Sequence, residues 1–285
     1  MRSPLLINEM CPAHQKPLEI YVFVDPLCPN SWAMEPVLRK LYIEYSQYFR
    51  LKQVLTADLN SLNTKKSNNE SLAQKWDEAA ARSGMSCDGT LWLEDSISAP
   101  FLASIAIKAA ELQGRRAGSR FLRQIQEALF IDRQNISDIQ VLTHCAKESG
   151  LDAEEFLNDI HSSSAAKAFQ CDLKISAEMD VDETPTLVFF NENIEEEGIK
   201  ITGLYSYEIY VQILEEMLEE LPEPKSPPPL EEFLKQFRFT ATKEITEVYN
   251  LTESEVEKEM KKLILQRKVR KVPVKFGSIW EYISE

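Results

Sequence analysis

The sequence lacks any run of about 18 consecutive apolar residues, the length that a membrane-spanning helix needs. Residues 1–9 turn acidic too soon to hold the apolar region of a secretory signal peptide. Wholesale disorder is excluded as well, because 44% of the residues are hydrophobic and 27% are charged, as in an ordinary globular protein. We therefore expect a folded protein in the cytoplasm, with no membrane partner.

The sequence also lacks a Cys-X-X-Cys pair. Its five cysteines are odd in number and well separated: Cys11, Cys28, Cys87, Cys145 and Cys171. In a cytoplasmic chain this usage argues against a framework of disulfides.

Cys11 and His14 offer a thiolate and an imidazole at a spacing that zinc accepts. A closed structural zinc site needs four ligands, and the sequence around this pair supplies no others. We treat the two residues as weak metal candidates, and we predict no cofactor.

Positive charge is in short supply, since 46 acidic residues face 32 basic ones and the net charge is −14. A surface of that sign repels phosphate backbones, which argues against a nucleic-acid partner. The imbalance is local: residues 229–285 hold 11 basic and 10 acidic residues, net +1, which leaves −15 to the rest of the chain.

The charge changes at a proline-rich segment, which marks a domain boundary. Five prolines lie within residues 221–230, where they fix φ, remove amide donors and favour an extended, semi-rigid spacer. We predict an N-terminal tail (1–15), a first domain (16–221), a linker (222–229) and a second domain (230–285).

The first domain alternates strand and helix patterns before and after a long helical stretch. We expect strands at 18–25 and 49–56 with a helix at 32–48 between them, helices over about 70–180, strands at 186–190 and 199–203, and a helix at 207–221. A strand–helix–strand opening favours a parallel pair. The order is that of a thioredoxin-like fold, an α/β class, with a helical insertion.

The second domain shows three helical patterns followed by two short strands. The helices are expected at 230–239, 243–249 and 253–266, and the strands at 269–274 and 279–283. Three helices and a β-hairpin suggest a small α+β domain of the winged-helix type.

Cys28-Pro-Asn-Ser-Trp stands where the first strand gives way to the first helix. Amides and the dipole at a helix N-terminus lower the pKa of a thiol, which predicts thiolate character for Cys28, although Asp25 and Glu35 counter this effect. Redox turnover needs a second thiol three residues on, and that position is Ser31. We interpret the loop as vestigial; the alternative is a monothiol thiol–disulfide oxidoreductase that acts through Cys28.

Pro185 directly precedes the predicted strand at 186–190. Proline is tolerated at the start of a strand, so its position alone needs no special role. In thioredoxin-like folds the proline at this place is cis and lies against the cysteine loop. We predict a cis Thr184–Pro185 bond beside Cys28, where backbone groups are available to an extended segment.

Residues 258–275 hold eight basic residues and a single acidic one. A positive patch on a winged helix suggests nucleic-acid binding. Helices that read DNA contact bases mainly through their N-terminal residues, which here are Glu253, Glu255 and Glu257. These carboxylates have the wrong sign, so we favour a docking role for this domain.

Five segments of the chain carry a resemblance to a known family: 16–29, 83–89, 108–114, 170–180 and 256–263. Together they are similar to the YjbH (SpxH) family of bacterial ClpXP adaptor proteins, a cytosolic branch of the DsbA-like thioredoxin superfamily. The resemblance covers nearly the whole chain.

The resemblance implies an adaptor that binds Spx, a thiol-stress transcription regulator, and promotes its degradation by the ClpXP protease without redox turnover. It implies no enzyme activity and no catalytic residue. Ser31 replaces a cysteine that other members carry, and only Cys11 and His14 remain of their metal-binding N-terminus. The residues that contact Spx are unknown from the sequence. We expect the helical insertion and the nearby thioredoxin-like surface to form the dock.

Overall fold

The computed structural model describes residues 16–56, 69–193, 197–220 and 222–283. The expected N-terminal tail, with Cys11 and His14, lies outside these residues. Within them, no helix is long and apolar enough to cross a membrane.

A four-stranded sheet forms the centre of the first domain. Its strands are β1 (Leu18–Val24), β2 (Phe49–Leu55), β3 (Thr186–Phe190) and β4 (Ile199–Thr202), in the order β2-β1-β3-β4. The β1–β2 pair is parallel, as the strand–helix–strand pattern predicts, and the other two pairs are antiparallel. All four strands lie within a residue of their expected positions.

The side chains of β1 alternate between two apolar layers, as the period of a strand requires. Ile20 and Val22 enter the large core, and Phe23 points to the other face, where it joins Val54 and Val188.

Two helices replace the single helix predicted at 32–48. They are α1 (Pro29–Ala33) and α2 (Glu35–Tyr45), separated at Met34. The break follows from Pro36, because a proline ring inside a helix clashes with the carbonyl four residues earlier, here that of Trp32.

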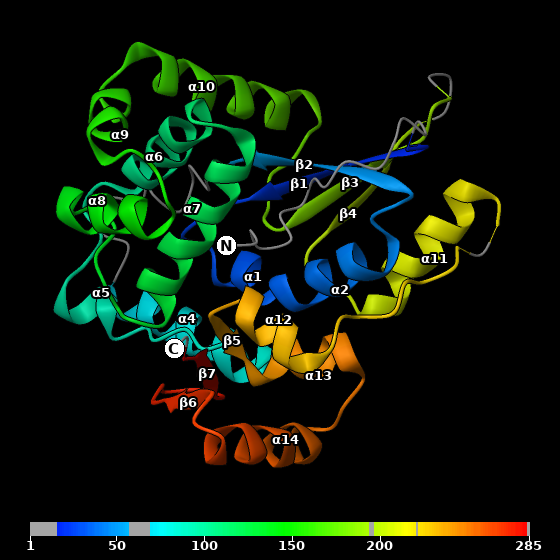
Figure 1. The fold of residues 1–285 in the computed structure, drawn as a ribbon. Coiled ribbons are helices and arrows are strands. Elements are labelled where there is room, and N and C mark those ends of the chain that lie inside the picture. Colours follow the sequence, from blue (N-terminus) through cyan, green and yellow to red (C-terminus); the bar gives the residue numbers. More distant parts are fainter. Residues whose placement is uncertain (1–15, 57–68, 194–196, 221, 284–285) are drawn as a thin grey trace.

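The helical insertion is present as predicted. Its helices are α4 (Asn69–Ser83), α5 (Leu91–Glu94), α6 (Pro100–Leu112), α7 (Arg115–Phe130), α8 (Ile139–Glu148), α9 (Ala153–Ile160) and α10 (Ser163–Glu178). Figure 1 shows most of them gathered at one end of the sheet. Aromatic contacts join them to each other and to α1: the Phe130 ring of α7 stacks on Trp32 of α1 at 5.5 Å and lies tilted, at 5.1 Å, against Trp76 of α4.

The C-terminal elements form a winged-helix-like arrangement. After α11 (Tyr207–Leu218) come α12 (Leu230–Gln236), β5 (Phe239–Ala241), α13 (Thr242–Tyr249), α14 (Glu253–Leu265), β6 (Val269–Val272) and β7 (Ile279–Tyr282). The sheet order is β5-β7-β6, with both pairs antiparallel. Strand β5 was not predicted: the helix expected to reach residue 239 ends at Gln236, and the next residues pair with β7.

The proline-rich segment 222–229 is fastened on both sides. Lys225 N donates to Glu44 O of α2 at 2.9 Å, and Tyr249 Oη of α13 donates to Pro228 O at 2.8 Å. Residues 222–229 form no helix, strand or turn. Because both ends of the segment are bonded to helices, it holds the two parts of the chain together closely.

The turn between β6 and β7 also touches the first domain. Gly277 has φ +66°, and a Cβ built there would lie 2.6 Å from the carbonyl oxygen of Gly84. Only glycine allows this backbone conformation and this approach together.

Candidate functional site

The cysteine loop and the proline loop meet at the end of β1. Cys28 caps α1, and its amide donates to Asp25 O at 3.0 Å. Its Sγ donates to Thr184 O at 3.5 Å, and the Thr184–Pro185 bond is cis. Two loops about 156 positions apart therefore come together in the arrangement that the sequence predicts.

The predicted thiolate character of Cys28 is wrong. Burial raises the pKa of the thiol above its ordinary value, and the Asp25 carboxylate raises it further. The hydrogen bonds from Thr184 and Ser31 lower the pKa without offsetting burial. With only five residues, α1 supplies little dipole to oppose these effects. Cys28 is therefore a thiol at neutral pH.

Ser31 occupies the position of a resolving thiol and is turned inward. Its side chain is buried, and its Oγ accepts a hydrogen bond from Asp25 N at 3.4 Å. The serine therefore supports the turn that carries Cys28.

The remaining cysteines of the described residues are all unpaired. Cys87 and Cys145 are buried, which raises the pKa of Cys87 well above its usual value and that of Cys145 to about 12, and Cys171 is exposed. Cys87 belongs to the loop that packs against α1, where Trp32 Nε1 donates to Ser86 O at 2.9 Å. The described residues contain no cluster of three or more His, Cys, Asp or Glu side chains that suits a metal.

The backbone next to the cis-proline is largely engaged within the chain. The Thr184 carbonyl accepts the Cys28 thiol, and the Pro185 carbonyl accepts Gly203 N at 2.8 Å. Leu204 and Tyr205, which follow Gly203, are exposed.

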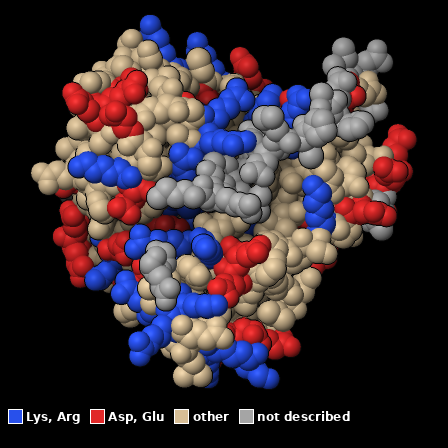
Figure 2. Space-filling model, viewed as in Figure 1, with Lys and Arg blue, Asp and Glu red and all other residues tan. Residues whose placement is uncertain are grey.

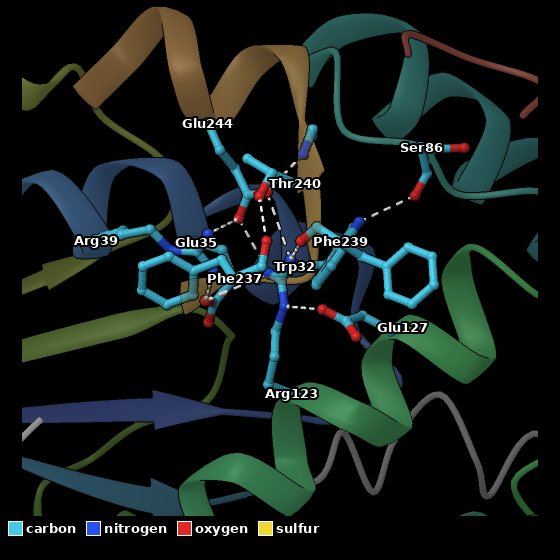
Figure 3. A network of polar contacts seen from close by, with 11 residues as sticks. Trp32, Glu35, Arg39, Ser86, Arg123, Glu127, Phe237, Phe239, Thr240 and Glu244 are labelled. Atoms are coloured by element: carbon cyan, nitrogen blue, oxygen red, sulfur yellow. Dashed lines mark hydrogen bonds and ion pairs between the residues drawn. The ribbon is translucent and has the colours of Figure 1, made fainter. Parts of the chain in front are cut away.

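A buried network of charges lies below α1, and sequence reasoning missed it (Figure 3). Its centre is Glu244 of α13, which is fully buried. Arg39 Nη1 lies 2.9 Å from Glu244 Oε1, an ion pair without hydrogen-bond alignment, and Arg123 Nη1 lies 3.1 Å from the same oxygen. Arg123 Nε also donates to Glu127 at 2.6 Å. The network joins α2, α7 and the C-terminal domain.

The two guanidinium groups of the network also stack on aromatic rings. The Arg123 guanidinium lies 4.4 Å from the Trp32 ring, and that of Arg39 lies 3.8 Å from the Phe237 ring. Through these contacts Trp32, next to the cysteine loop, and Phe237 of the C-terminal domain pack against the same network.

Glu35 completes the network instead of facing Cys28, where the sequence placed it. Its carboxylate lies 3.8 Å from Arg123 and 3.9 Å from Arg39, which are long ion pairs. Burial raises the pKa of Glu35, and also that of Glu127, whereas the two arginines lower the pKa of Glu244. The i, i+4 spacings of Glu35 with Arg39 and of Arg123 with Glu127 were the signals of this network in the sequence.

The basic run of residues 258–275 is largely neutralised. Ion pairs join Lys262 to Glu259, Lys268 to Glu231, Arg270 to Glu281, and Lys275 to Asp77 and Asp88. Figure 2 shows red and blue side chains mixed over this region.

Comparisons with known proteins agree with this architecture. Residues 21–212 match the family model described as Thioredoxin. The chain is 53% identical over 277 residues to the ClpXP adapter protein SpxH of Bacillus subtilis (96% of this chain, 92% of that protein). It is 54% identical over 276 residues to SpxH of Bacillus licheniformis, with the same coverage. The chain belongs to the SpxH family.

Solved structures extend the likeness in fold alone. A protein titled a putative protein disulfide isomerase, from Nitrosomonas europaea, matches with a TM-score of 0.62 and 19% identity, over 72% of this chain and 98% of that one. The thioredoxin-like, DsbA-like prediction for the fold is confirmed, and family membership is shown by the close relatives.

Proposed function

We propose that the chain is a cytoplasmic adaptor that binds Spx and promotes its degradation by ClpXP, without being an enzyme. The relatives named ClpXP adapter protein SpxH support this over nearly the full length. The observation that carries the non-redox part is the Cys28 loop, where the thiol pKa is raised and a buried Ser31 stands in place of a resolving thiol. An adaptor acts by binding, so it needs neither a thiolate nor a second thiol.

Binding accelerates degradation when it favours the form of Spx that the protease engages. In the proposed mechanism, the adaptor stabilises Spx with its C-terminal tail presented to ClpXP, as a shift of populations without chemistry. The helical insertion and the nearby thioredoxin-like surface form the dock. The net charge of −15 outside residues 229–285 favours a basic face on the partner.

The experiment measures the half-life of Spx in a purified ClpXP reaction without adaptor, with the unmodified chain and with Cys28→Ser. We expect both forms of the chain to shorten the half-life equally. A Cys28→Ser variant that folds, binds Spx and fails to shorten the half-life would refute the non-redox mechanism. If neither form has an effect, the adaptor function is wrong.

The second candidate is a monothiol thiol–disulfide oxidoreductase that acts through Cys28. The observation in its favour is the partly exposed Cys28 beside a cis-proline. It requires that Cys28→Ser abolish activity and that a mixed disulfide with the substrate be isolated on non-reducing gels.

We further propose that residues 16–221 and 230–285 are separate domains joined by the linker 222–229. In support, Phe233, Ile245, Val256 and Trp280 belong to a small core of their own. Ala241 and Ile279 of the second domain join the large core, so the two domains share an interface. The proposed function includes no binding of nucleic acid, because most basic side chains of residues 258–275 are paired with carboxylates.

A further inference from the structure

The exposed side of α14 changes character along its length. Exposed carboxylates lie at its start, at Glu253, Glu255 and Glu257, and the exposed lysines Lys258, Lys261 and Lys262 come after them. Two apolar side chains follow: Ile264 is 39% exposed and Leu265 is 84% exposed. A single exposed leucine is ordinary, but exposed apolar side chains that lie together and are bordered by charged ones are typical of an interaction site.

These side chains share one region of the surface. Lys258, Lys261, Lys262 and Leu265 are spaced by three, four and seven residues, so they lie on the same side of the helix. Arg267 follows the helix end, and among the described residues it has no ion-pair partner. We call Lys258, Lys261, Lys262, Ile264, Leu265 and Arg267 the α14 tip.

The chemistry of the α14 tip fits an acidic protein surface that presents an apolar side chain. Lys261 contacts Glu257 at 3.9 Å, and Lys262 contacts Glu259 at 2.6 Å. All four side chains are exposed, and exposed ion pairs of this kind contribute little, so both lysines can exchange their partners for a new carboxylate. Cations around an apolar centre give an interface its charge complementarity and its buried anchor. A phosphate backbone uses the cations alone and leaves Ile264 and Leu265 without a role, so the tip suits a protein better than DNA.

Two observations connect the α14 tip with the protease of the proposed function, on which this inference rests. The Thioredoxin family match ends at residue 212, before α14, whereas the likeness to ClpXP adapter proteins spans 96% of the chain. The C-terminal domain is thus the part that these adapters add to a thioredoxin-like fold. An adaptor also holds two proteins at once, and Figure 1 shows α14 at the edge of the molecule, away from the sheet and from α9 and α10.

We propose that the α14 tip docks an acidic, apolar-bearing surface of ClpXP, while the first domain holds the substrate. The contact leaves the Cys28 loop and the helical insertion free.

The test uses the full chain with Leu265→Glu and with the double change Lys261→Glu/Lys262→Glu. Ile283→Glu is the matched control for an exposed aliphatic side chain, since Ile283 is 41% exposed after β7 and lies outside both the α14 tip and the proposed substrate dock. Lys235→Glu on α12 is the control for an exposed lysine of the same domain. Each variant is assayed for binding to immobilised ClpXP, for binding to purified Spx and for ClpXP-dependent Spx degradation, after thermal unfolding has shown that it is folded.

We expect both tip variants to lose about tenfold or more in ClpXP binding and in degradation rate, and to keep Spx binding within about twofold. Both controls keep all three properties. Undiminished ClpXP binding in the Leu265→Glu variant overturns the proposal. A loss of Spx binding in the tip variants also overturns it, because the tip is then the substrate dock. A third contrary result is salt-dependent binding of duplex DNA that disappears in the lysine variant while ClpXP binding stays intact.

The outcome also separates this inference from the proposed function. If the unmodified chain binds ClpXP through the tip but does not bind Spx, the docking surface stands and the Spx adaptor function fails. If Spx is degraded normally with both tip variants, the adaptor function stands and the docking surface fails.

Discussion

The change Glu244→Gln tests how firmly the buried network holds the C-terminal domain. Glu244 is fully buried, receives ion pairs from Arg39 and Arg123, and accepts Ala241 N at 2.7 Å. A glutamine keeps the volume and an oxygen for the amide but removes the charge that both guanidinium groups face. Breaking a buried pair in this way costs about 3–5 kcal/mol, because an uncompensated charge is left in the interior.

The assay is urea unfolding of Glu244→Gln beside Glu247→Gln. Glu247 is on the same helix, but its partner Lys243 is well exposed, at 42%, so losing that pair costs at most about 1 kcal/mol. We expect a much lower midpoint for Glu244→Gln and nearly no shift for Glu247→Gln. Equal midpoints for the two variants would refute the structural role of the network.

Acid adds a second measurement on the same residue. The folded-state pKa of Glu244 is lowered by its two arginines, so its contribution is fully present above the ordinary glutamate pKa of 4.5 and is lost as the pH falls below it. Glu244→Gln should therefore flatten the loss of stability on acidification. A variant that keeps the steepness of the unmodified chain below pH 4.5 contradicts this assignment.

Three further predictions concern single positions. The pKa of Glu35 is raised in the folded state, so its ionisation lowers the free energy of unfolding as the pH rises above the ordinary glutamate pKa of 4.5. Glu35→Gln should therefore change stability little near pH 5 and make stability fall less between pH 5 and 8. Urea midpoints between pH 4 and 8 measure this, and an unchanged pH dependence contradicts it. Gly277→Ala should destabilise more than Gly150→Ala, since both have positive φ but only Gly277 has a carbonyl oxygen within 2.6 Å of the added carbon; equal losses in calorimetry would show that this contact yields. Cys28 should react with iodoacetamide at pH 7 more slowly than a free cysteine, and Asp25→Asn should speed the reaction, because burial first and the carboxylate second raise its pKa; mass spectrometry measures the rates, and a fast reaction in the unmodified chain would indicate a thiolate.

The central sheet was predictable from sequence because its strands are marked on both sides. After Leu18 and Glu19, the residues of β1 are all β-branched or aromatic, and the strand ends before Pro26. The residues of β3 begin directly after Pro185. The parallel pairing of β1 with β2 followed from the helix between them. Signals of this kind are local, and the strand pairing in the folded chain agrees with them.

The features that sequence reasoning missed depend on long-range contacts. Strand β5 has three residues and exists because β7 pairs with it. The thiol pKa of Cys28 was predicted with the wrong sign, since burial is a property of the folded chain. Glu244 gave no sign of its partners, because Arg123 lies 121 positions away. Charged residues that are far apart in the sequence show no regular spacing from which their pairing in the fold could be predicted.

The fastened linker has a consequence for how far apart two bound proteins sit. A mobile spacer lets its ends sample a range of distances, so partners on either side meet at an effective concentration set by its length. Here the hydrogen bonds of Lys225 to α2 and of Pro228 to α13 hold the two domains at one distance from each other. The reach of the molecule is therefore constant, and any segment handed from one domain to the other has to be long enough to cross that fixed span.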